Sequence, residues 1–291
     1  MKLNVLILTA VAAYFGPAPA KGQEKNNTVK SELPTANVLP LTPESFCSGL
    51  PNAFAITAQE FTIEANALCP GNAPSQAFRD LLTNAYSGQT NDPERIERDY
   101  IRDLPSSENI TGNNIQIFIA YAMKVPRKGV EALLAEESFV ETPYSRDILT
   151  INASFLPPPV NNGEADTAFS IEQKTNVNRT DNPQVIFNDV SRHELRMYRL
   201  HPNNFDFFLA VRTLAAPSEQ FSKSVVLRGV LADAAAPNDS SYIVTVLNFI
   251  MNSRDEPDSN IAEGMDETFR DFISRDMQTI YTAHTQAANG N

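Results

Sequence analysis

Alternation of apolar and polar residues predicts a run of strands in the second half of the chain. The clearest strand is Asn113–Val125, where isoleucine recurs at every second position. Because intervening residues such as Phe118 and Ala120 are also apolar, both faces of this strand are expected to be covered. Further strands are predicted at Asp147–Leu156, Thr167–Asn178, Gln184–Leu200 (as one strand or two), Phe205–Ala215, Phe221–Asp233 and Ser240–Arg254.

Apolar residues at helical spacing predict helices at both ends of this strand-rich region. Ser75 is expected to cap a helix whose apolar face carries Phe78. A second helix is expected to open at Asn91–Glu94, where a proline and acidic residues suit the first turn. A short helix is predicted at Lys128–Glu137. The last helix, Ile261–His284, has one broad apolar face opposite a charged face, which predicts packing on a core.

The first twenty residues have the pattern of a secretory signal. Lys2 precedes the apolar run Leu3–Phe15, and Ala18–Ala20 forms a small-x-small cleavage site. The alternatives are a buried N-terminal helix or a membrane anchor, but the run is shorter than the roughly 20 residues that span a bilayer. No later segment is apolar for long enough to cross a membrane. The sequence therefore predicts cleavage after Ala20 and a soluble secreted or periplasmic protein.

The two cysteines, Cys47 and Cys69, predict a disulfide in an exported chain. The alternatives are a metal pair or a catalytic thiol, but none of the histidines, at positions 193, 201 and 284, lies near them in sequence. The segment between the cysteines is compatible with a short hairpin around Ala55–Ile63. The predicted organisation is a signal peptide at 1–20, a flexible leader at 21–45, a disulfide-stapled region with two helices at 46–109, an α+β domain at 110–285 and a tail at 286–291.

The order of a strand, a short helix, about six strands and a long C-terminal helix resembles the START and polyketide-cyclase-like helix-grip (SRPBCC) superfamily. The segments that carry the resemblance are Ile117–Leu134, with a helix that begins just after a proline, and the final strand and helix, Tyr242–Tyr281. It covers about residues 110–285 and implies a curved antiparallel sheet that grips the last helix around an apolar cavity. The cavity in turn implies binding of a lipid, sterol or aromatic ligand, and less often catalysis. An antiparallel α+β domain of another topology would fit the same elements.

Composition and motifs exclude several functions. A hydrophobic content of 42% and a charged content of 20% are ordinary for a globular protein. A formal net charge of −12 disfavours nucleic-acid binding, because such a surface repels phosphate. His193-Glu194 begins a zinc-protease motif, but Met197 stands where the second histidine is needed. Asp255–Asp258 lacks the spacing of a calcium loop. With 11 glycines and no nucleotide-binding fingerprint, the sequence predicts no cofactor, no metal and no identifiable catalytic residues.

Polar residues inside apolar strands are the candidate ligand-binding groups. Arg212 follows Phe208 in one strand, and Asn248 lies in the same strand as Tyr242. A buried polar group needs a partner, and inside a cavity it would orient the polar end of a ligand. The more common outcome is that such groups face solvent or pair with a neighbouring strand, and that Tyr242 and Phe208 are core residues.

The sequence alone predicts an exported protein that binds a small apolar or lipid-like molecule between sheet and last helix. The alternatives are a hydrolase or cyclase-like enzyme using polar groups in the same cavity, and a non-catalytic interaction protein of the cell envelope. A perturbed acid–base pair would favour the enzyme. The sequence leaves open the ligand, the protein partners and the use of glycosylation sequons at Asn26, Asn109, Asn152, Asn178 and Asn238.

Overall fold

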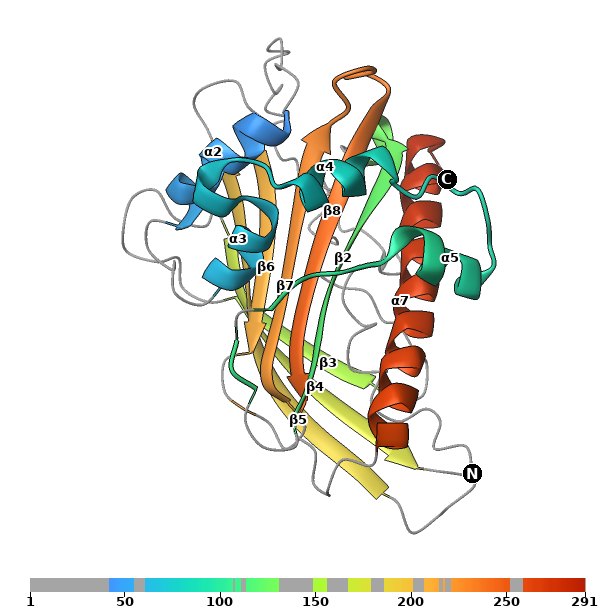
Figure 1. The fold of residues 1–291 in the computed structure, drawn as a ribbon. Coiled ribbons are helices and arrows are strands. Elements are labelled where there is room, and N and C mark those ends of the chain that lie inside the picture. Colours follow the sequence, from blue (N-terminus) through green and yellow to red (C-terminus); the bar gives the residue numbers. More distant parts are fainter. Residues whose placement is uncertain are drawn as a thin grey trace, which may run out of the picture.

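A single antiparallel sheet of eight strands organises the described part of the chain (Figure 1). The computed structural model describes residues 42–54, 61–106, 108–110, 114–130, 149–155, 167–178, 186–200, 207–214, 217, 221–251 and 259–290. The expected signal peptide, most of the leader and most of the helix expected at Lys128–Glu137 lie outside these residues. The strand order is β1-β2-β8-β7-β6-β5-β4-β3. The strands are β1 (Arg102–Asp103), β2 (Ile115–Pro126), β3 (Leu149–Phe155), β4 (Thr167–Asn178), β5 (Ile186–Leu200), β6 (Phe207–Leu214), β7 (Phe221–Ala232) and β8 (Ser240–Met251).

Helices precede and follow the sheet in the sequence. The N-terminal group comprises α2 (Pro43–Phe54), α3 (Thr62–Leu68), a single 3₁₀ turn η1 (Pro70–Asn72), α4 (Gln76–Thr83) and α5 (Pro93–Tyr100). The chain ends with the long helix α7 (Ser259–Ala288). Residues 127–130 are also helical. The predicted cap is confirmed: Ser75 accepts a hydrogen bond from the Phe78 backbone N–H at 3.1 Å. The second helix begins where expected, and Asp92 caps it by accepting a hydrogen bond from the Glu94 backbone N–H at 3.2 Å.

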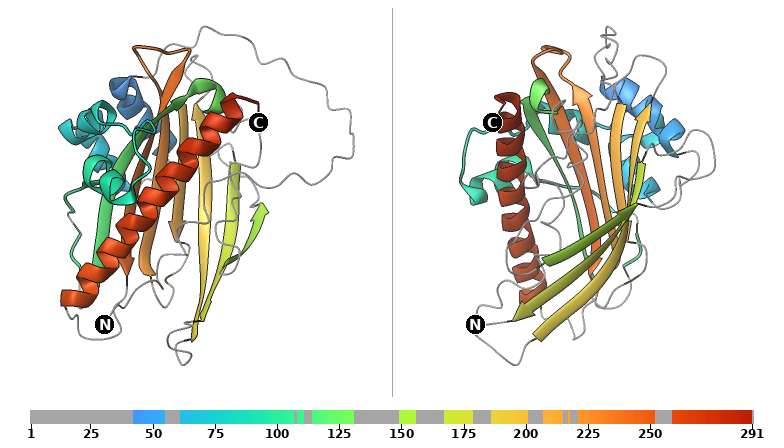
Figure 2. Two further views of the ribbon diagram at one scale, coloured as in Figure 1. Left: turned by 90° about the vertical axis from the view of Figure 1, so that its right-hand side faces the viewer. Right: turned by 180° about the vertical axis from the view of Figure 1, so that it is seen from behind.

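The sheet is covered on both faces, which explains why its central strands are apolar on both sides (Figures 1 and 2). On one face, Ile119 and Val226 pack with Met277 of α7 and with α5. On the other face, Ala120 and Leu227, the adjacent residues of the same strands, pack with α2, α3 and α4. We call these the α7 face and the N-terminal face. Figure 2 shows that α7 runs obliquely across the strands and that β3–β5 run steeply across the direction of β2, β7 and β8.

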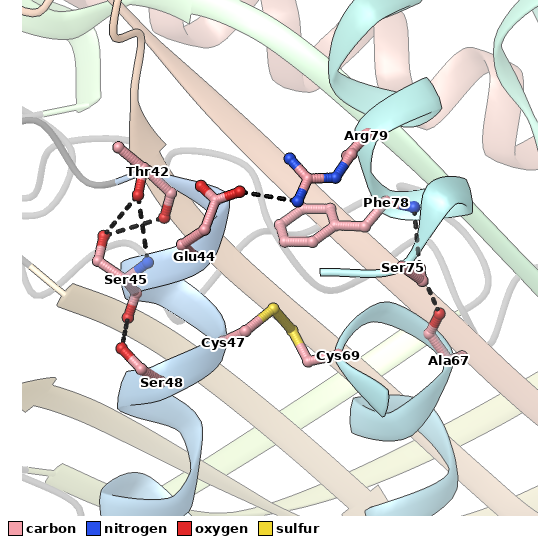
Figure 3. Close-up of a disulfide and its surroundings, with 10 residues drawn as sticks. All are labelled: Thr42, Glu44, Ser45, Cys47, Ser48, Ala67, Cys69, Ser75, Phe78 and Arg79. Carbon is pink, nitrogen blue, oxygen red and sulfur yellow. Dashed lines mark hydrogen bonds and ion pairs between the residues drawn. A yellow bond between two sulfur atoms is a disulfide. The ribbon is translucent and has the colours of Figure 1, made fainter. Parts of the chain in front are cut away.

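The predicted disulfide is confirmed. Cys47 of α2 is bonded to Cys69, which follows α3, and no other cysteine is present (Figure 3). The hairpin expected around Ala55–Ile63 is wrong where the structure describes it, because Ile63 lies in α3. Helix α3 buries Ala65 and Leu68 against the N-terminal face of the sheet, so tertiary packing overrides the β-branched character of this segment.

The element order agrees with the predicted one. A first strand, a helical turn, six further strands (β3–β8) and a long C-terminal helix follow each other within the described residues. The α+β class, the antiparallel sheet and the disulfide of the N-terminal region are therefore confirmed. The prediction of two helices in that region is wrong, because its described residues form four, α2–α5. Residues 186–200 form one strand rather than two. No helix of the described part is both long and apolar enough to cross a bilayer.

Candidate functional site

Three polar side chains form a row across the middle of the α7 face. Thr245 on β8 pairs in register with Tyr121 on β2 and with Arg228 on β7, so the three residues lie side by side on adjacent strands. Paired residues of an antiparallel sheet point to the same face. All three are buried, and Arg228 is only 1% exposed. We call this set the polar row.

Hydrogen bonds connect the members of the polar row. Nε of Arg228 donates to the hydroxyl of Thr245 at 3.0 Å, and Nη2 of Arg228 donates to the hydroxyl of Tyr121 at 3.1 Å. Burial raises the pKa of the Tyr121 hydroxyl above its ordinary value, whereas the nearby Arg228 opposes that rise. Tyr121 therefore stays a neutral donor and acceptor at physiological pH. The row places a permanent positive charge and two hydroxyl groups inside an apolar core.

Helix α7 carries two titratable groups whose pKa values respond to this charge. Burial raises the pKa of Asp276 to about 7, although the positive charge of Arg228 lowers it. Burial also lowers the pKa of His284 to about 4, and Arg228 contributes to that decrease. Arg228 thus interacts electrostatically with a carboxyl and an imidazole on the same helix. The fold brings together, from β2, β7, β8 and α7, groups that are far apart in sequence.

His284 is held in a defined orientation. Its Nδ1 lies 2.7 Å from the carbonyl oxygen of Ile280, and because a carbonyl can only accept, Nδ1 carries the proton. Nε2 is then an acceptor, and it is buried without a hydrogen-bond partner among the described residues. The imidazole is only 2% exposed. This site therefore contains a neutral histidine at neutral pH with an unused lone pair.

A second buried network lies on the N-terminal face and accounts for Asn248. The Asn248 amide donates to Glu64 of α3 at 2.6 Å and to Glu108 at 2.8 Å, and it accepts from Gln116 at 2.8 Å. The ammonium group of Lys223 binds Glu64 at 2.9 Å and Glu108 at 2.6 Å. The network joins the stapled region to β2, β7 and β8. One oxygen of Glu64, Oε2, has no hydrogen-bond partner among the described residues.

The other predicted ligand-binding residues lie on strands β8 and β6. Tyr242 packs against the core of the N-terminal face, and Nζ of Lys124 lies 5.8 Å from the centre of its ring. Phe208 and Arg212 of β6 pair in register with Val230 and Val226, two residues of the α7-face core. The ligand-binding role of all four residues remains a prediction.

The polar row was not predicted from the sequence, although one of its members shows the same pattern as Arg212, a charged residue inside an apolar strand. Arg228 interrupts the apolar run of β7, as Arg212 interrupts that of β6. Tyr121 and Thr245 give no such signal, because both residue types are common in strands. No group of three or more histidine, cysteine or acidic residues able to hold a metal occurs in the described part of the chain. His193 lies in strand β5, so its partial zinc-protease motif is not helical there.

No protein-family model and no curated protein matches the sequence. Similar solved structures include a START superfamily protein from Mycobacterium smegmatis, with 11% sequence identity and a TM-score of 0.31. That alignment covers 57% of this chain and 97% of the other. A putative uncharacterised protein from Rhizobium leguminosarum aligns over the same shares of the two chains, with 10% identity and a TM-score of 0.25.

Proposed function

We propose that this chain is an exported binding protein that holds a small, largely apolar molecule between its sheet and α7. Export is supported by the N-terminal signal pattern and by the disulfide, since disulfides persist mainly in oxidising compartments. The observation that carries the proposal is the buried position of Arg228 on the α7 face. Small-molecule sites are typically apolar and contain a few convergent polar groups that orient the ligand.

Packing alone does not explain the polar row. Replacing a buried charged group by an apolar residue of similar volume is often neutral or stabilising, so a fold that needs only a core gains little from a buried guanidinium. The N-terminal face is closed by helices whose buried polar groups contact the sheet directly, as Glu64 does. We therefore place the ligand on the α7 face, where the twist of the sheet turns β3–β5 across the direction of the central strands (Figure 2).

Native mass spectrometry of the purified chain, before and after incubation with the uncharged dye Nile red, tests this proposal. Val225 and Val226 are adjacent, equally buried and on opposite faces, which gives a matched pair of variants. Substituting phenylalanine at either position adds similar volume to a core. We expect V226F to prevent binding and V225F to retain it. Detection of only the ligand-free protein in every sample, or loss of binding in V225F alone, would contradict the proposal.

A second candidate, an acid–base enzyme using the same site, is favoured by Asp276. A carboxyl whose pKa is raised to about 7 suits proton transfer near neutral pH, and its environment differs from that of His284, whose pKa is lowered. The two candidates differ in the fate of the bound molecule. If a co-purified ligand is recovered as a chemically altered product from the original chain but unaltered from D276N, the protein is an enzyme.

A further inference from the structure

We propose that the molecule bound on the α7 face carries a hydroxyl group that donates a hydrogen bond to Nε2 of His284, an inference that rests on the function proposed above. Its first support is the position of His284 on α7. Fully buried residues recur along this helix at intervals of three and four positions, at Ile273, Met277, Ile280 and His284. The first three pack in the core of the α7 face. His284 therefore continues the stripe of α7 that faces the sheet.

The second support is that the imidazole has an acceptor which the protein leaves unused. Nδ1 donates to the carbonyl oxygen of Ile280 at 2.7 Å, so Nε2 is the acceptor of the ring. His284 is only 2% exposed, and Nε2 has no hydrogen-bond partner among the described residues. Most buried polar groups in proteins are hydrogen-bonded, and leaving one unpaired is costly. A donor on a bound molecule would supply the partner that the chain does not.

The third support is that the acceptor is held in place. The backbone of Gly129 lies so close to that of His284 that a Cβ atom at position 129 would be 1.9 Å from the His284 carbonyl oxygen. This contact fixes α7 at His284, and the hydrogen bond from Nδ1 to Ile280 fixes the ring. Nε2 is therefore preorganised, so that a hydroxyl binding there requires little reordering of the protein.

The chemistry of Nε2 defines the class of ligand. Burial lowers the pKa of His284 to about 4, so near neutral pH the imidazole is uncharged and Nε2 offers only a lone pair. An alcohol or a phenol can donate to it, whereas an ether, an ester or a carboxylate cannot. A hydroxyl also adds only one polar atom to the core, which suits a molecule whose remainder lies against apolar side chains.

Displacement of Nile red near neutral pH by 1-dodecanol and by its methyl ether, which has the same alkyl chain but no hydroxyl proton, measures this preference. One hydrogen bond between neutral groups predicts that the alcohol binds about fivefold more tightly. H284F replaces the imidazole by an apolar ring and should abolish the preference. A steric penalty on the extra methyl group of the ether would instead persist in H284F. M277L, in the same buried stripe but without a polar group, should retain the preference.

Nitrogen-15 NMR of the histidine side chains gives a second measurement that needs no variant to fold. The structure predicts that Nδ1 of His284 carries the proton and that Nε2 does not. In the original chain, dodecanol should shift the Nε2 resonance in the direction of hydrogen-bond acceptance, and the methyl ether should leave it unchanged.

Three results would overturn the inference. Equal affinities for the alcohol and the ether, or tighter binding of the ether, would refute a bond from the hydroxyl while leaving the proposed function in place. A preference for the alcohol that persists in H284F, or an Nε2 resonance that dodecanol does not shift, would place the hydroxyl elsewhere. Failure of Nile red and of both competitors to bind the original chain would overturn the proposed function, and the role of His284 with it.

Discussion

The hydroxyl of Thr245 lies 3.0 Å from Nε of Arg228, and both side chains are buried in the middle of the sheet. The substitution T245V keeps the shape of the side chain but removes this acceptor. A buried charged donor would then lose its partner, so we expect a loss of about 2 kcal/mol in the free energy of unfolding. Urea denaturation of the variant and of the original chain measures the loss.

The double variant R228M/T245V provides the control for that prediction. Because it removes the donor as well as the acceptor, we expect it to be less destabilised than the sum of the two single variants. Additive losses would indicate that the hydrogen bond between Arg228 and Thr245 contributes little to stability.

Gly129 lies against the backbone of α7 near its C-terminal end. A Cβ atom at position 129 would lie 1.9 Å from the carbonyl oxygen of His284, which is too close for any side chain. G129A should therefore shift the end of α7 and destabilise the protein by about 2 kcal/mol or more. Urea denaturation and amide exchange of α7 would detect the change.

Gly71 offers a matched control for G129A. It has a positive φ of 61°, which asparagine tolerates, and a Cβ there would meet no atom within 4 Å. G71N should leave α7 unaffected. Equal effects of G129A and G71N would show that the contact between Gly129 and His284 is unimportant.

A substitution at Asn248 tests the N-terminal face of the sheet independently of the α7 face. N248L removes the amide that contacts Glu64 and Glu108, leaving buried carboxylate oxygens with fewer donors. We expect a loss of about 2–3 kcal/mol in unfolding free energy and no change in Nile red affinity. Weaker Nile red binding by folded N248L would support the ligand-binding role predicted for Asn248 from the sequence.

His284 should make stability depend on pH in a predictable direction. Its pKa is 6.5 in a model peptide and about 4 in the folded protein, because burial disfavours the imidazolium. Between these values the unfolded chain binds a proton that the folded chain does not. Stability from His284 is therefore complete above pH 6.5 and is lost as the pH falls to about 4, by on the order of 3 kcal/mol.

Asp276, whose pKa is raised from 3.8 to about 7, should make stability depend on pH in the opposite direction. The folded chain then binds the extra proton, so stability from Asp276 is complete below pH 3.8 and is lost as the pH rises through about 7. The pH dependences of stability that arise from His284 and from Asp276 partly cancel in the original chain. Each is therefore obtained by comparing the unfolding free energy of the original chain with that of a variant lacking the group, at each pH. H284N should flatten the loss on acidification, and D276N should remove the loss between pH 4 and 7. Identical pH profiles in all three proteins would contradict both assignments.

Much of the fold was predictable from local patterns. Ser75 caps its helix as expected, α5 begins within the expected segment Asn91–Glu94, and the period-two pattern places β2 within two residues of its observed bounds. The disulfide followed from the number of cysteines and their expected compartment. These features depend on residues close together in the sequence or on composition, so they need no knowledge of the tertiary structure.

The site was harder to predict because it depends on register between distant strands. Alternation shows that β2, β7 and β8 each have two apolar faces, but it does not show which face α7 covers. Placing Tyr121 beside Thr245 requires the pairing of β2 with β8, across more than a hundred intervening residues. For the same reason Asn248, which is buried, could not be assigned from the sequence to the face of the N-terminal helices.

Amide hydrogen exchange with and without saturating Nile red tests most directly the claim that the ligand binds between the sheet and α7. The account predicts slower exchange in α7 when the dye is bound, with unchanged exchange in α2, α3 and α4. Slower exchange confined to α2, α3 and α4, with α7 unaffected, would contradict it.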